Sequence, residues 1–129
     1  MPAAVSLSPQ PRLLLLGLEP SIARDLEEVL AGKSTALTRS VPADLLSFLA
    51  VLQEWQPDVL FCPARHRHLN EILERASARR LPVVVVTRDP DAREWIEAMD
   101  AGATDYVAAP FHPDQIEWVL QSSLLQPSC

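Results

Sequence analysis

The chain has 129 residues, which is enough for one domain with a single hydrophobic core. Hydrophobic residues make up 48% of it and charged residues 22%, as in an ordinary globular protein. The formal net charge of −6 argues against a nucleic-acid partner, and the ten arginines and one lysine form no basic stripe along a predicted helix.

The cysteines and the apolar runs bear on the compartment. Cys62 and Cys129 do not form the disulfide framework of a small secreted domain, so we expect a reducing, cytoplasmic location. The apolar run at 13–16 is far shorter than the ~18 residues of a membrane span. Glu19-Pro20 follows it in place of a small-residue signal cleavage site. We therefore expect no association with a membrane.

Five strand patterns alternate with five helical patterns along the chain. The predicted strands are 13–16, 34–39, 59–62, 83–86 and 106–107. Four β-branched residues make the run at 83–86 the clearest of these strands. The run at 34–39 is more polar, which favours an edge position in the sheet.

Each predicted helix carries apolar residues at helical spacing. Pro20 suits the first position of the first helix, Gly32 is a candidate left-handed cap at its end, and Gly102 ends the fourth helix. In chain order the predicted core stripes are Ile22, Leu26, Val29 and Leu30; Leu45, Phe48, Leu49 and Leu52; Leu69, Ile72, Leu73 and Ala76; Ala92, Ile96 and Met99; and Ile116, Val119, Leu120 and Leu124.

Regular alternation of strands and helices predicts an α/β fold, with a parallel sheet, right-handed crossovers and helices on both faces. Ligands of such sheets bind beyond the carboxyl ends of the strands. The residues predicted at this position are Gly17, Leu18, Pro63, Thr87 and Ala109. We expect a leader at 1–11, one domain at 12–125 and a tail at 126–129.

From about residue 12 to residue 124 the chain resembles the receiver domain of response regulators, the phosphorylation-controlled module of bacterial two-component signalling. The matching motifs are Glu19-Pro20, Pro57-Asp58, Pro82 with Thr87, Ala101-Gly102-Ala103, Asp105-Tyr106 and Pro110-Phe111. The resemblance implies a flavodoxin-like (βα)5 fold with strand order 2-1-3-4-5. It also implies that the Ala109-Pro110 bond is cis, as the matching Lys-Pro bond commonly is in that family.

The same resemblance implies that the phosphorylation chemistry is missing. The family's acid pair, which helps to hold Mg²⁺, falls on Gly17 and Leu18, its phosphoacceptor on Pro63 and its lysine on Ala109, so that only Thr87 is retained. Proline offers no nucleophile, leucine no metal ligand and alanine no cation. We therefore expect a pseudo-receiver that is not an enzyme, has no cofactor and binds no Mg²⁺. A shift of the alignment by one residue would place Cys62 at the phosphoacceptor position, and phosphorylation of an unexpected residue is the least favoured alternative.

Basic residues follow the third strand and suggest a second interpretation. Arg65, Arg67 and Arg88 could form an anion-binding rim, in which case the domain would be a small-molecule or anion sensor, or they could be solvated loop residues. Cys62, His66 and His68 have poor spacing for a metal site. With three glycines in the chain, no Gly-rich nucleotide-binding loop is present.

The leading hypothesis is signalling by protein–protein contact. In the family, the residues matching Thr87 and Tyr106 form the switch pair, and the surface of the fourth helix, last strand and last helix binds partners. That comparison assigns Trp95, Met99, Tyr106 and Val119 to an interaction face for an unidentified protein or for a second copy of the chain. The alternative for Trp95 is that it packs against the edge of its own helix.

Overall fold

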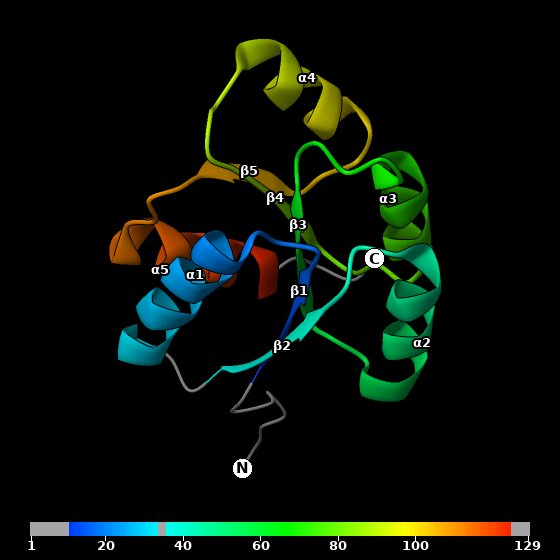
Figure 1. The fold of residues 1–129 in the computed structure, drawn as a ribbon, viewed down its shortest axis with the longest axis horizontal. Coiled ribbons are helices and arrows are strands. Elements are labelled where there is room, and N and C mark those ends of the chain that lie inside the picture. The colour runs from blue at the N-terminus through cyan, green and yellow to red at the C-terminus, as the bar shows by residue number, and fades with distance from the viewer. Residues whose placement is uncertain (1–10, 34–35, 125–129) are drawn as a thin grey trace.

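The computed structural model describes residues 11–33 and 36–124. Residues 1–10 of the predicted leader, residue 125 and the predicted tail at 126–129 lie outside this part. Five strands and five helices alternate along the chain (Figure 1). They are β1 (Arg12–Leu16), α1 (Pro20–Lys33), β2 (Leu37–Val41), α2 (Leu45–Trp55), β3 (Val59–Pro63), α3 (Leu69–Ala78), β4 (Val83–Thr87), α4 (Ala92–Asp100), β5 (Asp105–Ala108) and α5 (Pro113–Leu124).

The strands form one parallel sheet in the order β2-β1-β3-β4-β5, which confirms the predicted topology. The sheet separates two apolar clusters: α2, α3 and α4 pack on one face, while α1 and α5 pack on the other (Figure 1). Alternate residues of the central strands point to opposite clusters, as Leu60 and Phe61 of β3 do. This burial on both faces explains why β1, β3 and β4 are unbroken apolar runs.

Three local predictions need correction. The edge strand β2 runs from Leu37 to Val41, past the predicted end at residue 39, because this exposed strand has little apolar patterning to mark its bounds. Residues 34 and 35 of the predicted strand lie outside the described part. Helix α1 continues through Gly32 to Lys33, so Gly32 is not its cap. In α4 the only residue that is fully buried is Ala98, while Ile96 is 50% exposed and Ala92 is exposed, so only Met99 of the predicted core stripe packs against the core.

The turns that shape the carboxyl end of the sheet are well defined. Gly17, at the exit of β1, has a φ of 65°, and its N–H donates to the carbonyl oxygen of Val41 at 2.9 Å. The Asp44 carboxylate caps α2 by accepting hydrogen bonds from the Ser47 N–H and hydroxyl, and these bonds lower the pKa of Asp44. The Ala109-Pro110 bond is cis, as predicted. Within the part of the chain described, no helix is both long and apolar enough to cross a membrane.

Candidate functional site

A cavity of 190 Å³ lies at the carboxyl ends of β1, β3 and β4, where the sheet topology predicts a ligand site. Four of the five predicted pocket residues line it, and Ala109 packs instead against the apolar cluster beneath α1 and α5. The lining consists of Gly17, Leu18, Glu19, Ile22, Pro63, Ala64, Arg65, Val86, Thr87, Arg88 and Asp89.

Thr87 supplies the hydroxyl group of this lining, and local contacts engage it. Its Oγ1 accepts a hydrogen bond from the Asp89 N–H at 3.2 Å and lies 3.4 Å from the Asp89 carbonyl oxygen, to which it donates. The side chain is 9% exposed. Thr87 therefore stabilises the turn that leaves β4.

Position 17, to which the resemblance assigns the first acid of the pair, is closed by packing. A Cβ added to Gly17 would lie 2.4 Å from the Cβ of Ala43 and 2.9 Å from its Cα, far inside van der Waals contact. The chain segment between β2 and α2 thus covers the site from which an acidic side chain would reach into the pocket. Leu18, at the second position, packs against the apolar cluster of α1 and α5.

Glu19, an acid next to the lost pair, is paired with an arginine. The Nη2 group of Arg88 donates to Glu19 Oε1 at 2.9 Å and to Ser21 Oγ at 2.6 Å. These bonds join the β4–α4 loop to the start of α1. The positive charge of this guanidinium beside Glu19 weakens the attraction of its carboxylate for a metal ion. The described residues contain no group of three acidic, histidine or cysteine side chains arranged to hold one.

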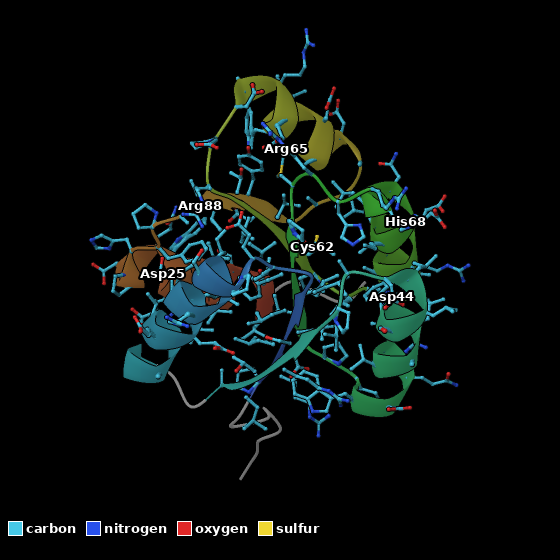
Figure 2. The ribbon with its side chains drawn as sticks, viewed as in Figure 1. Asp25, Asp44, Cys62, Arg65, His68 and Arg88 are labelled. Atoms are coloured by element: carbon cyan, nitrogen blue, oxygen red, sulfur yellow. The ribbon has the colours of Figure 1, made fainter. Side chains whose placement is uncertain are left out.

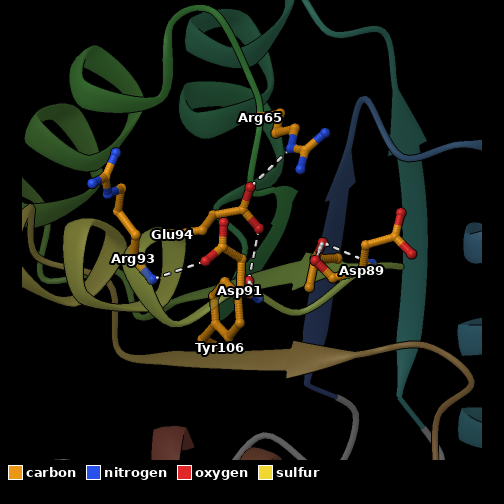
Figure 3. Close-up of polar contacts among 7 residues, drawn as sticks. Arg65, Asp89, Asp91, Arg93, Glu94 and Tyr106 are labelled. Carbon is orange, nitrogen blue, oxygen red and sulfur yellow. Dashed lines mark hydrogen bonds and ion pairs between the residues drawn. The ribbon is translucent and has the colours of Figure 1, made fainter.

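A second series of polar contacts runs from Arg65 at the pocket through Glu94 of α4 to Tyr106 of β5 (Figure 3). Arg65 Nε donates to Glu94 Oε2 at 2.9 Å, and the Tyr106 hydroxyl donates to Glu94 Oε1 at 2.7 Å. The same hydroxyl accepts a hydrogen bond from the Asp91 N–H at 3.3 Å. One carboxylate therefore connects the β3–α3 loop, the first turn of α4 and β5.

The environment of Glu94 favours its ionised form. Its side chain is only 13% exposed, and this burial alone would raise its pKa. The hydrogen bonds from Tyr106 and Arg65 and the charge of Arg65 outweigh burial and leave the pKa of Glu94 lowered. In turn, the Glu94 bond raises the pKa of Arg65, while burial and then Glu94 raise that of Tyr106.

The predicted anion rim of three arginines is wrong in part. Arg65 and Arg88 line the pocket, on loops at the same end of the sheet (Figure 2). Arg67 lines a different hollow, together with His66 and Glu97. Both arginines in the pocket are already paired with carboxylates.

The residues weighed as a metal or nucleophilic site are separated by the structure. Cys62 is fully buried in β3, and burial raises the pKa of its thiol to about 12, so it is protonated at neutral pH. His66 Nδ1 accepts a hydrogen bond from the His68 N–H at 2.9 Å, and His68 Nδ1 lies 3.3 Å from Glu71 Oε1. The histidines thus shape the entry to α3.

Only some of the residues predicted for the interaction face are exposed in the structure. Trp95 is 49% exposed, while Met99 and Tyr106 are half-buried. Val119 is 1% exposed and faces the α1–α5 cluster, so it cannot belong to a surface. Sequence reasoning missed two features: Ile96, which was assigned to the core, and Glu94, which pairs with a residue 29 positions away.

Comparisons with known proteins agree with the architecture. No family model matches the chain. It is 28% identical over 109 residues, 81% of its length, to the DNA-binding response regulator MtrA of Mycolicibacterium smegmatis, and the alignment covers 46% of that protein. A putative response regulator from Chloroflexus aurantiacus is similar in structure, with 25% identity, a TM-score of 0.78 and coverage of 91% and 99% of the two chains. The receiver domain of the putative response regulator NarL from Mycobacterium tuberculosis aligns with a TM-score of 0.75 at 14% identity, over 92% and 100% of the chains.

The strand order and these similarities show a flavodoxin-like receiver fold. The relatives named here are response regulators, and the chain is similar to them. The chain spans about half the length of the curated relative that it matches. At the positions to which the resemblance assigns the acid pair and the phosphoacceptor, the cavity is lined by Gly17, Leu18 and Pro63.

Proposed function

We propose that this is a pseudo-receiver, a signalling domain that works without phosphorylation or catalysis and through contact with another protein. The observation that carries the proposal is the rebuilt pocket: Gly17 lies under Ala43, proline occupies position 63, and Arg88 pairs with Glu19. Phosphoryl transfer depends on a nucleophile, a metal ion and positive charge around the phosphoryl oxygens, and the residues present supply no such set. A cytoplasmic location without membrane or nucleic-acid contact belongs to the same proposal.

The proposed interaction surface is the outer side of α4 together with β5. Trp95 and Ile96 are about half exposed on a helix whose only fully buried residue is Ala98, and Tyr106 lies next to this helix. Adjacent exposed aromatic and aliphatic side chains are typical of binding hot spots. The expected partner is a protein, and a second copy of the chain would use the same surface.

The surface is tested by comparing Trp95→Ala with Trp118→Ala. Trp118 is 62% exposed on α5 and is a matched control for the loss of one surface tryptophan. Sedimentation velocity measures self-association, and capture from a lysate measures partner binding. Trp95→Ala should weaken either self-association or partner binding, while Trp118→Ala should leave both of these unchanged. Equal behaviour of wild type and Trp95→Ala would remove this surface from consideration.

Phosphorylation independence has its own test. The protein is incubated with a small phosphodonor and Mg²⁺, and intact mass is followed beside a receiver domain that retains its acids. The control should gain one phosphoryl group and this chain none. Any stable or labile phosphate on the chain would contradict the proposal.

A second candidate is an anion sensor, favoured by the position of Arg65 and Arg88 on one 190 Å³ cavity. An anion there must compete with Glu94 and Glu19 for the two guanidinium groups. If the site binds phosphate, the melting temperature should rise with phosphate concentration at fixed ionic strength, and Arg88→Gln should abolish the rise.

A further inference from the structure

We propose that Arg65, Glu94 and Tyr106 act as one unit that holds α4 against β5, so that the position of this helix is fixed from the pocket side without a phosphoryl group. The holding of α4 stands on the contacts alone, and only its consequence for partner binding rests on the proposed function. This series of hydrogen bonds starts at Arg65, two residues after the position of the lost phosphoacceptor, and ends at Tyr106 on β5.

Helix α4 has little apolar anchoring of its own. Ala98 is fully buried and Met99 is partly buried against the core, and both lie in the second half of the helix. Figure 1 shows α4 at the edge of the molecule, beside β4 and β5. The first half of the helix is therefore held mainly by polar contacts.

Glu94 provides those contacts at the first turn of α4. Its two carboxylate oxygens are used separately, Oε2 by Arg65 and Oε1 by Tyr106. Both bonds involve the charged carboxylate, whose side chain is 13% exposed. The bond to Tyr106 is partly buried, whereas the Arg65 side chain is 75% exposed and its ion pair is therefore partly screened by solvent. The Asp91 N–H adds a bond to the Tyr106 hydroxyl and brings the start of the helix to the same point.

The chemistry of the carboxylate is what lets one side chain serve both partners. A carboxylate offers acceptors on both oxygens, whereas a glutamine side chain offers one acceptor oxygen and one donor group. In Glu94→Gln, the amide oxygen can still accept from Arg65 and the NH₂ group can donate to the Tyr106 hydroxyl, but the negative charge that strengthens both bonds is gone. The isosteric change therefore weakens the connection at both ends with almost no change in side-chain volume.

The test is hydrogen exchange at the amides of α4 in the full chain. Arg65→Gln and Glu94→Gln should each speed exchange of these amides about tenfold, the change expected when local opening becomes easier by one stabilising contact, while the amides of β3 and β4 keep their wild-type rates. Matched controls are Arg67→Gln, from the same loop, and Glu97→Gln, an exposed acid of the same helix. Both controls should exchange like the wild type. Wild-type rates in Arg65→Gln, or equal acceleration in Arg67→Gln, would overturn the proposal.

A double variant tests whether the three residues act together. Arg65 and Tyr106 bond to different oxygens of Glu94, so any coupling between them passes through that residue. If the three residues form one unit, the α4 amides of the double variant Arg65→Gln/Tyr106→Phe should exchange no faster than those of the faster single variant. If the two accelerations of exchange multiply instead, Arg65 and Tyr106 hold α4 independently and the unit is refuted.

Association measurements on the same variants separate this proposal from the proposed surface. If Arg65→Gln speeds hydrogen exchange in α4 and Trp95→Ala leaves association unchanged, the proposed unit is supported and the proposed interaction surface is contradicted. If Trp95→Ala weakens association and Arg65→Gln changes neither exchange nor association, the interaction surface is supported and the unit is contradicted.

Discussion

Gly17 and Ala43 lie so close together that a methyl group on residue 17 would come within 2.4 Å of the Ala43 Cβ. Gly17 also has a φ of 65°, in the left-handed region that side chains disfavour. Any larger residue at this position must displace the segment that leads into α2. Restoring an aspartate at position 17 therefore requires this segment to move.

Gly17→Ala should lower the free energy of unfolding by about 2–4 kcal/mol, combining overpacking with the cost of a left-handed alanine. Ala43→Gly in the same chain removes the Cβ contact and should recover part of this loss. Urea denaturation of the two single variants and the double variant measures both terms. A Gly17→Ala protein as stable as the wild type would contradict the packing described here.

Tyr106→Phe removes the hydroxyl that donates to Glu94 and accepts from Asp91. The expected loss of stability is about 1–2 kcal/mol, as for a hydrogen bond to a charged group. The same substitution in a Glu94→Gln background should cost less, because the charged acceptor is already absent. Chemical denaturation of the four proteins of this cycle gives the comparison, and equal costs in both backgrounds would show that the two side chains are not coupled.

His66 makes the stability depend on pH. Burial, and then the neighbouring charges of His68 and Arg67, lower its pKa below the ordinary value of about 6.5. The unfolded chain then binds a proton in a pH range where the folded chain does not, so stability falls as pH drops below about 6.5 toward the folded pKa. Protonation at Nδ1 would also remove the acceptor of the His68 N–H.

His66→Asn retains an acceptor near the position of Nδ1 but does not titrate. The melting temperature of this variant should fall less steeply than that of the wild type as the pH is lowered from neutral. Scans at several pH values and fixed ionic strength provide the measurement. Identical slopes would rule out His66 as the source of the dependence.

Gln56 ends α2 in a left-handed conformation, with a φ of 53°. Glycine adopts this conformation without steric cost, so Gln56→Gly should stabilise the protein by about 0.5–1 kcal/mol. Gln53→Gly, an exposed position inside the same helix, should instead destabilise it by about 1 kcal/mol. Thermal denaturation of both variants distinguishes a cap effect from a general effect of glycine.

Addition of Mg²⁺ should leave the melting temperature unchanged at fixed ionic strength. The reason is that Glu19 pairs with Arg88, and a single carboxylate is a poor site for an ion that prefers several oxygen ligands. A stabilisation that saturates with Mg²⁺ concentration would show that a metal site exists in spite of these contacts.

The fold could be predicted from the sequence because the central strands are buried on both faces. Such strands must be apolar throughout, and the runs of β1, β3 and β4 stand out for that reason. The edge strand β2 has the sequence Leu-Thr-Arg-Ser-Val and is largely exposed, so its boundaries carried a weak signal. The predicted pocket positions meet at one cavity, apart from Ala109.

The polar contacts of the site could not be predicted in this way. Arg88 and Glu19 are 69 residues apart, and their meeting depends on the conformations of two loops that hydrophobic periodicity does not describe. Periodicity placed Val119 correctly in the core, and the assignment of this residue to a surface came from the family comparison. For α4, periodicity placed Ile96 in the core although it is half exposed, because this helix carries apolar residues on more than one side.

The complete burial of Cys62 in the middle of the sheet gives the protein an internal reporter of its own opening. With Cys129→Ser, Cys62 is the remaining thiol of the chain, and a thiol reagent can reach it only when the cluster that α2, α3 and α4 form with this face of the sheet opens. The labelling rate then measures how often this side of the core opens under native conditions, without any attached probe.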